Sequence, residues 1–211
     1  MSEEPFLEIL ARERASAILR TGDEAVARRA MRAAVEGGFR VIEFTLTTPG
    51  ALKLIAEFAA EPNLVVGAGT VLTVEQAEQA VEAGARFLVS PVVDEAVIIR
   101  AASLGAAAMP GCATPTEMLR AHNGGAALQK LFPEPGTGPA WVKQTLGPLP
   151  FLRIVPTSGV TLENAAAYLA AGAFAIGFVN SLFDPADLAA ARFEAVRERA
   201  AAMCAAVKGA K

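Results

Sequence analysis

Lys130 is the side chain of this sequence most able to do covalent chemistry. It lies in an apolar run, residues 126–133, and is one of only five lysines in the chain. A lysine in a buried strand is costly, because an unpaired ammonium loses its hydration there. A lowered pKa relieves this cost, and the resulting neutral amine is a nucleophile toward carbonyls. The alternative is a lysine at a strand end, with a buried stem and a charged head that reaches water.

Glu43 is a candidate acid–base partner for this amine. In residues 40–47 apolar and polar side chains alternate, which in a strand puts them on opposite faces: Ile42, Phe44 and Leu46 toward helices, and Glu43, Thr45 and Thr47 toward the interior. An interior carboxylate needs a partner or must hold its proton. Two interpretations stay open, a structural ion pair with an arginine and a proton shuttle beside Lys130 at a neighbouring strand end.

Composition excludes several classes of function. The chain has 211 residues, is 53% hydrophobic and carries a formal net charge of −3, with its basic residues spread out. We therefore expect one domain with a sizeable core and no nucleic-acid partner. No apolar stretch is long enough to span a membrane, and residues 1–5 are acidic where a secretory signal would be basic. Two distant cysteines, Cys112 and Cys204, are typical of buried thiols in a reducing cytoplasm.

The single histidine, His122, limits metal and triad chemistry. One histidine and two distant cysteines cannot build a His-rich or Cys-rich zinc site, so we expect no metal. An all-carboxylate magnesium site stays open in principle, although no acidic cluster is evident. A Ser-His-Asp triad would need His122, which precedes Asn123-Gly124-Gly125 and is interpreted as a C-terminal capping residue of a helix.

A repeating pattern predicts the elements that position these residues. Five segments combine an Ala-rich helix, a glycine that ends it, and a short apolar run typical of a buried strand, at residues 36–43, 82–89, 103–109, 123–128 and 171–176. Three further apolar runs cover 15–19, 64–67 and 151–155. Helix starts are predicted at capping boxes that begin with Thr21, Thr73 and Thr114, and at Asp184-Pro185.

Eight such units predict a (β/α)8 TIM barrel, in the α/β class. We expect residues 1–211 to form this single domain, with a C-terminal helix from about residue 184. A doubly wound open sheet is the alternative that the same alternation permits. The barrel is favoured because the strand count is eight and no Gly-x-Gly-x-x-Gly turn follows the first strand. In a barrel, chemistry is carried at the C-terminal ends of the strands.

Polar and glycine-rich motifs follow the predicted strands. They are Gly67-Ala68-Gly69-Thr70, Ser90-Pro91, Met109-Pro110-Gly111-Cys112, Phe132-Pro133, Thr157-Ser158-Gly159 and Gly177-Phe178-Val179-Asn180. Each motif is weak alone, because glycine and proline also punctuate ordinary loops. Their joint placement at one end of the barrel is a stronger signal. Loops after the seventh and eighth strands often hold phosphate in such barrels.

Taken together, these motifs resemble the 2-keto-3-deoxy-6-phosphogluconate (KDPG) and 4-hydroxy-2-oxoglutarate (KHG) aldolase family. The similarity runs from about residue 15 to 183, with matching order and spacing. The motifs that carry it are Val41-Ile42-Glu43-Phe44-Thr45-Leu46, Gly67-Ala68-Gly69-Thr70-Val71-Leu72, Ser90-Pro91, Pro110-Gly111, Lys130-Leu131-Phe132-Pro133 and Pro156-Thr157.

The resemblance implies a metal-independent class I aldolase with no separate cofactor. It implies that Lys130 forms a Schiff base with the 2-keto carbon and that Glu43 moves protons. It further implies that Thr70 contacts the pyruvate portion, that Pro91 walls the site, and that Phe132 of the K-x-F-P motif borders the substrate. The implied reaction is cleavage of a 2-keto-4-hydroxy acid, KDPG above all, to pyruvate and glyceraldehyde 3-phosphate. The implied assembly is a homotrimer.

Two departures from the family pattern concern substrate binding. The family has an arginine for the substrate carboxylate where this chain has Thr47, which loses the bidentate charge contact. Arg20, at the end of the first strand, is the candidate replacement. The family's T-G-G and G-G-S phosphate loops are altered here, and the candidate phosphate-binding residues are Ser158, Gly159, Gly177 and Asn180.

The sequence is therefore consistent with three functions. The leading one is cleavage of KDPG. The second uses the same lysine on an unphosphorylated keto acid, such as KHG, or as a decarboxylase of an oxaloacetate-like acid. The third is a barrel that binds a small acid or sugar phosphate without turnover. None of the three involves a membrane or a nucleic acid.

Overall fold

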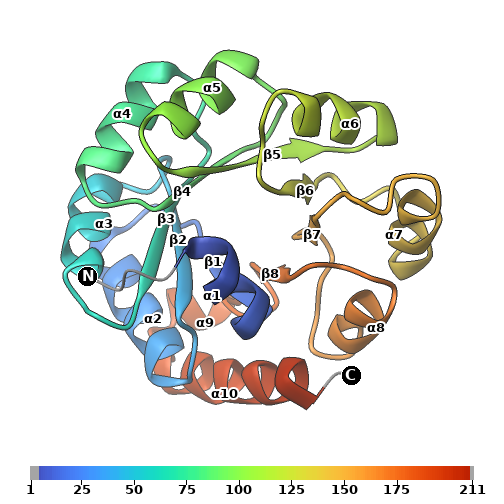
Figure 1. The fold of residues 1–211 in the computed structure, drawn as a ribbon. Coiled ribbons are helices and arrows are strands. Elements are labelled where there is room, and N and C mark those ends of the chain that lie inside the picture. The colour runs from blue at the N-terminus through green and yellow to red at the C-terminus, as the bar shows by residue number, and fades with distance from the viewer. Residues whose placement is uncertain (1–4, 210–211) are drawn as a thin grey trace.

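The strands form a ring of eight around a common axis. The structure, a computed structural model, describes residues 5–209. Within them, eight parallel strands are hydrogen-bonded in the order β7-β6-β5-β4-β3-β2-β1-β8, as Figure 1 shows. The strands are β1 (Ala15–Leu19), β2 (Val41–Thr45), β3 (Val65–Gly69), β4 (Phe87–Ser90), β5 (Ala107–Cys112), β6 (Gln129–Leu131), β7 (Ile154–Pro156) and β8 (Ile176–Phe178). This confirms the barrel, because a doubly wound sheet would reverse its strand order at the first strand.

Helices cover the outside of the ring (Figure 1). They are α2 (Glu24–Glu36), α3 (Ala51–Ala59), α4 (Val74–Glu82), α5 (Glu95–Ser103), α6 (Pro115–Asn123), α7 (Pro139–Leu146) and α8 (Ala165–Ala170). The main core lies between these helices and the outer faces of the strands. Ile42 and Phe44 of β2 belong to it and are fully buried, as the alternation in that strand predicts.

A short helix that the sequence pattern did not predict, α1 (Phe6–Glu13), closes the N-terminal end of the barrel. Its buried face packs into a second apolar cluster, inside the ring, with residues such as Val41 and Val65 that begin their strands. Phe6 stacks on Phe87, with ring centroids 4.6 Å apart. Because apolar side chains fill the interior at this end, we expect the polar chemistry at the C-terminal end of the ring.

Most predicted helix starts are confirmed, with one correction. Thr114 and Glu117 form a capping box, and the side chain of Thr73 accepts a hydrogen bond from the amide of Gln76. The cap of α2, however, is Asp23 and not Thr21, because the Asp23 carboxylate accepts from the amide of Val26. His122 lies in the last turn of α6 with Gly124 as the C-cap residue.

The C-terminal segment forms two helices where one was expected from about residue 184. Asp184 caps the short α9 (Pro185–Ala189), and α10 (Phe193–Gly209) follows. The break coincides with Ala191, whose φ of 53° is left-handed and therefore incompatible with a continuing helix. Residues 1–4, part of the segment read as unlike a secretory signal, lie outside the described residues. None of the described helices is long and apolar enough to cross a membrane.

The ring is least tightly joined between β7 and β8. In the described part of the chain no strand ladder links these two strands, which are the two ends of the hydrogen-bonded order. One backbone hydrogen bond connects their neighbourhoods, from the amide of Phe174 to the carbonyl of Ile154 at 2.9 Å. We call this junction the β7–β8 seam.

Candidate active site

Lys130 and Glu43 face each other across the barrel. Lys130 is the middle residue of β6 and Glu43 the middle residue of β2, and three strands separate β6 from β2 in the sheet order. The expectation that they lie at neighbouring strand ends is therefore wrong. In a closed eight-stranded ring, β2 and β6 are diametrically opposite, and two inward side chains at opposite positions meet over the interior.

The Lys130 amine is held in an environment that disfavours its charge. Burial lowers its pKa, the charge of Glu43 raises it, and the charge of Arg20 lowers it further. The Nζ atom lies 4.8 Å from the centre of the Phe132 ring. Lys130 as a whole is half-buried, and the lowered pKa of its amine favours a nucleophile over a fully solvated surface lysine.

Glu43 is almost completely buried, with 1% of its surface exposed. Burial raises the pKa of its carboxyl group, while the positive charges of Lys130 and then Arg20 oppose that change. Its Oε2 atom has no hydrogen-bond partner. Among the described residues Glu43 also forms no ion pair with an arginine, which removes the structural ion pair as its explanation.

Glycine at position 69 makes room for this carboxylate. A Cβ atom at Gly69 would overlap the Oε1 atom of Glu43, so any larger residue would displace it. The next residue, Thr70, has a left-handed backbone with φ of 59°, which is uncommon outside glycine. The Thr70 hydroxyl accepts a hydrogen bond of 3.2 Å from the Nη2 atom of Arg20. Strands β1 and β3 thus bring a cation and a hydroxyl to the same place.

Thr47 lies at the exposed end of β2 and contacts other threonines. Its hydroxyl is 3.0 Å from that of Thr45, which in turn is 3.2 Å from that of Thr48. The structure therefore places a hydroxyl cluster, and no positive charge, where the family pattern has arginine. Arg20 is the guanidinium that acts electrostatically on both Lys130 and Glu43.

Pro91 follows β4 and lies against β5. A Cβ atom at Gly111 would overlap the backbone of Pro91, so the glycine allows the two chains to approach closely. The hydroxyl of Ser90 donates to the carbonyl of Val92 at 2.6 Å and holds this turn. Phe132 lies two residues after Lys130 and one residue beyond the end of β6.

The four candidate phosphate residues do not all lie together. Ser158 and Gly159 follow β7, and Asn180 follows β8, all at the C-terminal end of the ring. Gly159 has φ of 71°, a conformation that favours glycine. Gly177, in contrast, is a buried residue within β8. A Cβ atom there would come within 2.6 Å of the Cδ1 atom of Ile18, so Gly177 borders the barrel interior.

Two residues that sequence reasoning did not select support this region. The hydroxyl of Ser181 donates to the carbonyl of Val160 at 2.7 Å and so ties the loop after β8 to the loop after β7. Glu134 accepts hydrogen bonds from the amides of Gly136 at 2.9 Å and Gly138 at 2.7 Å, which shapes the loop after Lys130. A glutamate before two glycines in a loop is the signal that could have identified Glu134.

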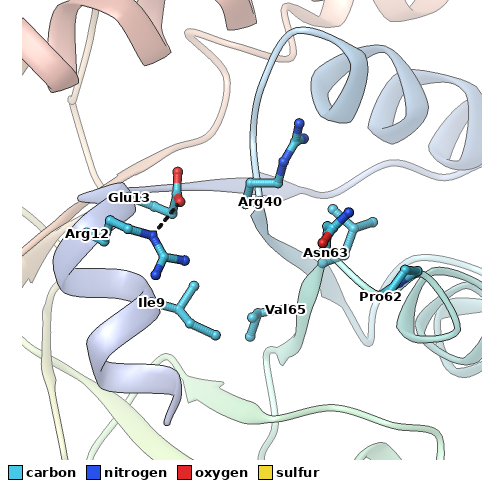
Figure 2. A pocket seen from close by; sticks show the side chains of 8 residues that line it. Ile9, Arg12, Glu13, Arg40, Pro62, Asn63 and Val65 are labelled. Carbon is cyan, nitrogen blue, oxygen red and sulfur yellow. Dashed lines mark hydrogen bonds and ion pairs between the residues drawn. The ribbon is translucent and has the colours of Figure 1, made fainter. Parts of the chain in front are cut away.

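A cavity of about 250 Å³ lies at the other end of the barrel and carries no comparable chemistry. Figure 2 shows Ile9, Arg12 and Glu13 of α1 on one side of it, with Arg40 and Asn63 on the other. Arg12 pairs with Glu13 at 3.2 Å, and Arg40 donates to the carbonyls of Val35 and Phe39. Within residues 5–209, no three histidine, cysteine, aspartate or glutamate side chains gather as a metal site.

Comparisons with known proteins agree with this geometry. The family model described as "KDPG and KHG aldolase" matches residues 7–198. A probable 2-dehydro-3-deoxy-6-phosphogalactonate aldolase from Rhizobium meliloti is 39% identical over 193 residues, which are 90% of this chain and 89% of the relative. A 2-dehydro-3-deoxy-phosphogluconate aldolase from Treponema pallidum is 42% identical over 141 residues, 66% of this chain and 67% of the relative.

A solved structure adds direct chemical information about a similar protein. The KDPG aldolase of Legionella pneumophila, with pyruvate captured as a covalent carbinolamine intermediate, superimposes with a TM-score of 0.84. It is 26% identical, and the match covers 93% of this chain and 97% of that one.

Proposed function

This chain belongs to the KDPG and KHG aldolase family, and we propose that it cleaves a 2-keto-3-deoxy-6-phospho sugar acid to pyruvate and glyceraldehyde 3-phosphate. The observation that carries the proposal is the pairing of the half-buried Lys130, in the middle of β6, with the buried carboxyl group of Glu43 in β2, each of which acts electrostatically on the other. An aldolase of this family is a carbon–carbon lyase. A Schiff base through Lys130 needs neither a metal nor a separate cofactor.

Lys130 and Glu43 divide the chemistry between them. The neutral amine of Lys130 adds to the C2 ketone, and loss of water leaves an iminium. Glu43 takes the proton of the C4 hydroxyl, the C3–C4 bond breaks, and its electrons move toward the iminium to give an enamine and an aldehyde. Glu43 then returns the proton to C3, and water releases pyruvate. A carboxyl group whose pKa is raised by burial suits this exchange, because it holds a proton more firmly than an ordinary carboxylate and can still return it to carbon.

Arg20 and Thr70 are the proposed binding groups for the substrate carboxylate. They are hydrogen-bonded to each other at 3.2 Å, and Arg20 supplies the charge that Thr47 lacks. Pro91 and Phe132 border the pyruvate portion. Ser158, Gly159, Gly177 and Asn180 are the proposed phosphate residues, with Gly177 acting from inside β8 by leaving space.

The configuration at C4 distinguishes two candidate substrates. KDPG and the phosphogalactonate analogue differ only at that carbon, so both give the same two products. Support for the phosphogalactonate analogue comes from the Rhizobium meliloti relative, whose similarity covers 90% of this chain, against 66% for the Treponema pallidum relative named for phosphogluconate. We therefore place the C4 epimer beside KDPG as a second candidate.

Comparing kcat/KM for KDPG, its C4 epimer, KHG and oxaloacetate tests the proposal. We expect pyruvate release from one of the two phosphorylated acids to exceed that from the unphosphorylated acids by at least about a hundredfold, because a phosphate bound at charge-assisted contacts contributes several kcal/mol. A preference for KHG or oxaloacetate would assign the chain to the unphosphorylated keto acids. If the protein binds these acids but releases pyruvate from none of them, the proposed activity is wrong and the protein is a barrel that binds a small acid without turnover.

We further propose that the protein acts as a cytoplasmic homotrimer. Both cysteines are free, which is consistent with a reducing compartment. Sedimentation equilibrium of the purified protein would test the assembly, with three times the chain mass of 21.8 kDa as the expected result.

A further inference from the structure

One hydroxyl group joins the loops that follow β7 and β8. The Oγ atom of Ser181 donates to the carbonyl oxygen of Val160 at 2.7 Å. Strand β7 ends at Pro156 and β8 at Phe178, so both residues lie just beyond the C-terminal ends of their strands. Within residues 5–209 no strand ladder crosses the β7–β8 seam, although the two strands are neighbours in the ring (Figure 1). The hydroxyl of Ser181 therefore bridges the seam at the end of the barrel where barrels carry their chemistry.

The N-cap residue of α8 braces the loop after β7. The Nδ2 atom of Asn164 donates to the carbonyl of Gly159, and its Oδ1 atom accepts from the amide of Thr161, both at 2.8 Å. These two bonds hold the chain on either side of Val160, which is itself buried in the main core. The carbonyl that Ser181 contacts therefore belongs to a segment with a fixed shape.

The loop after β8 is anchored to the C-terminal helix α10. The Nε atom of Arg199 donates to the carbonyl of Leu182 at 3.1 Å, and its Nη2 atom donates to the Oδ2 atom of Asp187 at 2.6 Å. Leu182 is fully buried and Asp187 is 7% exposed. A charge-assisted contact with this carboxylate restricts the guanidinium, so the residue that follows Ser181 is held in place.

Proposed phosphate residues adjoin the bridge on both sides of the seam. Ser158 and Gly159 directly precede Val160, and Asn180 directly precedes Ser181. A phosphate held by two loops gains from both only when the loops keep a constant separation, because binding is weakened by whatever ordering it must still impose. A hydrogen bond across the seam restricts that separation before the ligand arrives. A substrate that lacks phosphate makes no such demand on the two loops.

We propose that Ser181 is a positioning residue that sets the selectivity of this aldolase for phosphorylated keto acids, by holding the loops after β7 and β8 at the separation that one phosphate group requires. The inference rests on the proposed function and adds to it the residue that assembles the phosphate site. Ser181 acts through Val160 and the two loops and is not itself a phosphate ligand. Because Lys130 and Glu43 belong to β6 and β2, the bridge affects binding of the phosphate and not the covalent chemistry.

Measuring one variant on two kinds of substrate tests this selectivity. In Ser181→Ala we expect kcat/KM for the preferred phosphorylated acid to fall about three- to tenfold, mainly through a higher KM, which is the size expected for one lost hydrogen bond. Cleavage of KHG and exchange of the pyruvate methyl hydrogens with deuterium should stay at the wild-type rate. Ser181→Thr keeps the hydroxyl and should restore most of the wild-type KM. Ser181→Cys, whose thiol is a weak donor, is the second variant if the alanine variant does not fold.

The matched control is Ser103→Ala, which removes an exposed hydroxyl on α5 that donates to the carbonyl of Arg100. It should match the wild type on both kinds of substrate. An unchanged KM for the phosphorylated acid in Ser181→Ala would show that the loops hold phosphate without the bridge. An equal loss of kcat/KM on phosphorylated and unphosphorylated acids would show a general structural effect. Either result would overturn the role of Ser181 in selectivity.

Binding of inorganic phosphate separates failure of this inference from failure of the proposed function. Calorimetry needs no turnover, and we expect the wild type to bind phosphate and Ser181→Ala to bind it about three- to tenfold more weakly. If the wild type releases pyruvate from no keto acid, the proposed function fails, and the phosphate measurement still decides whether Ser181 assembles an anion site. If the wild type cleaves keto acids but neither binds phosphate nor prefers a phosphorylated acid, the inference is overturned while the aldolase activity stands.

Discussion

The carboxylate of Glu43 occupies the volume that a side chain at position 69 would need. A Cβ atom built on Gly69 overlaps the Oε1 atom of Glu43, and the two residues belong to neighbouring strands, where Glu43 pairs with Gly67 and Thr45 with Gly69. Gly69 of β3 thus leaves the volume that the carboxyl group of Glu43, the proposed acid–base group, occupies, although the glycine contributes no functional group.

Replacing this glycine should inactivate the enzyme without unfolding it. In Gly69→Ala the new methyl group pushes the Glu43 carboxylate out of position, and we expect kcat to fall at least about a hundredfold, the usual contribution of a placed acid–base group. The matched control is Gly22→Ala, because a Cβ atom at Gly22 meets nothing within 4 Å. Equal activity of the two variants would show that the position of Glu43 is not restricted by Gly69.

We expect Glu43 to move protons and not to form the covalent bond. In Glu43→Gln the amide cannot exchange protons, so we expect kcat for cleavage to fall by about 10²–10⁴-fold. Exchange of the pyruvate methyl hydrogens with deuterium from D2O, followed by NMR, should fall in parallel. Borohydride trapping of pyruvate should persist. A variant that exchanges these hydrogens at the wild-type rate would assign the proton transfer to another group.

Burial of Glu43 should cost stability in a pH-dependent way. Because its folded pKa is raised, the native state holds the proton at pH values where the unfolded chain, with a model value of 4.5, has lost it. The free energy of unfolding should therefore be unaffected by this carboxyl group below about pH 4.5. It should fall as the pH rises from there through the folded pKa. Burial is the largest cause of the pKa shift of Glu43, so its pKa stays raised although the charges of Lys130 and Arg20 oppose the change.

The variant Glu43→Gln tests that sign. At neutral pH it should melt higher than the wild type, by about 2–4 °C for each kcal/mol of relieved cost, and near pH 4 the difference should disappear. Glu82→Gln, on the exposed surface of α4, provides a control for a general charge effect. A Glu43→Gln variant that melts lower than the wild type at neutral pH would contradict the raised pKa.

Arg20 should govern affinity for the substrate carboxylate. Loss of a charge-assisted pair weakens binding by about 1.5–3 kcal/mol, so Arg20→Ala should raise KM by about 10- to 150-fold. Arg20→Lys keeps the positive charge but loses the two-pronged geometry of the guanidinium. Its KM should therefore lie between those of the wild type and Arg20→Ala. Arg120→Ala is a suitable control, since Arg120 is exposed on α6 and pairs with Glu95. An unchanged KM in Arg20→Ala would contradict this role and would assign binding of the substrate carboxylate to the hydroxyl groups of Thr45, Thr47 and Thr48.

The sequence predicted the barrel because each unit carries its own local signals. A glycine after a helix, an apolar run and a polar residue at its end are all readable within about 25 residues, and the inward face of β2 follows from strict alternation. The family motifs then identified the chain correctly. The placement of Glu43 and Lys130 on opposite strands of the ring could not be predicted in this way. It depends on how eight strands close into a barrel, and no local sequence pattern encodes that closure.

The other features that the sequence pattern did not predict also have physical causes. Helix α1 is short, and its apolar face packs against the N-terminal end of the barrel. The reason for that apolar face is therefore evident only once the barrel is known. Asp23 displaced Thr21 as the cap of α2 because both are good capping residues and the backbone decides between them.

Borohydride reduction in the presence of pyruvate, followed by peptide mapping, shows whether Lys130 forms the Schiff base. We expect one stable adduct per chain, on the peptide that contains Lys130, and none in a folded Lys130→Met variant. An adduct on Lys53, Lys143 or Lys208, or none on the folded wild type, would contradict a catalytic amine inside this barrel.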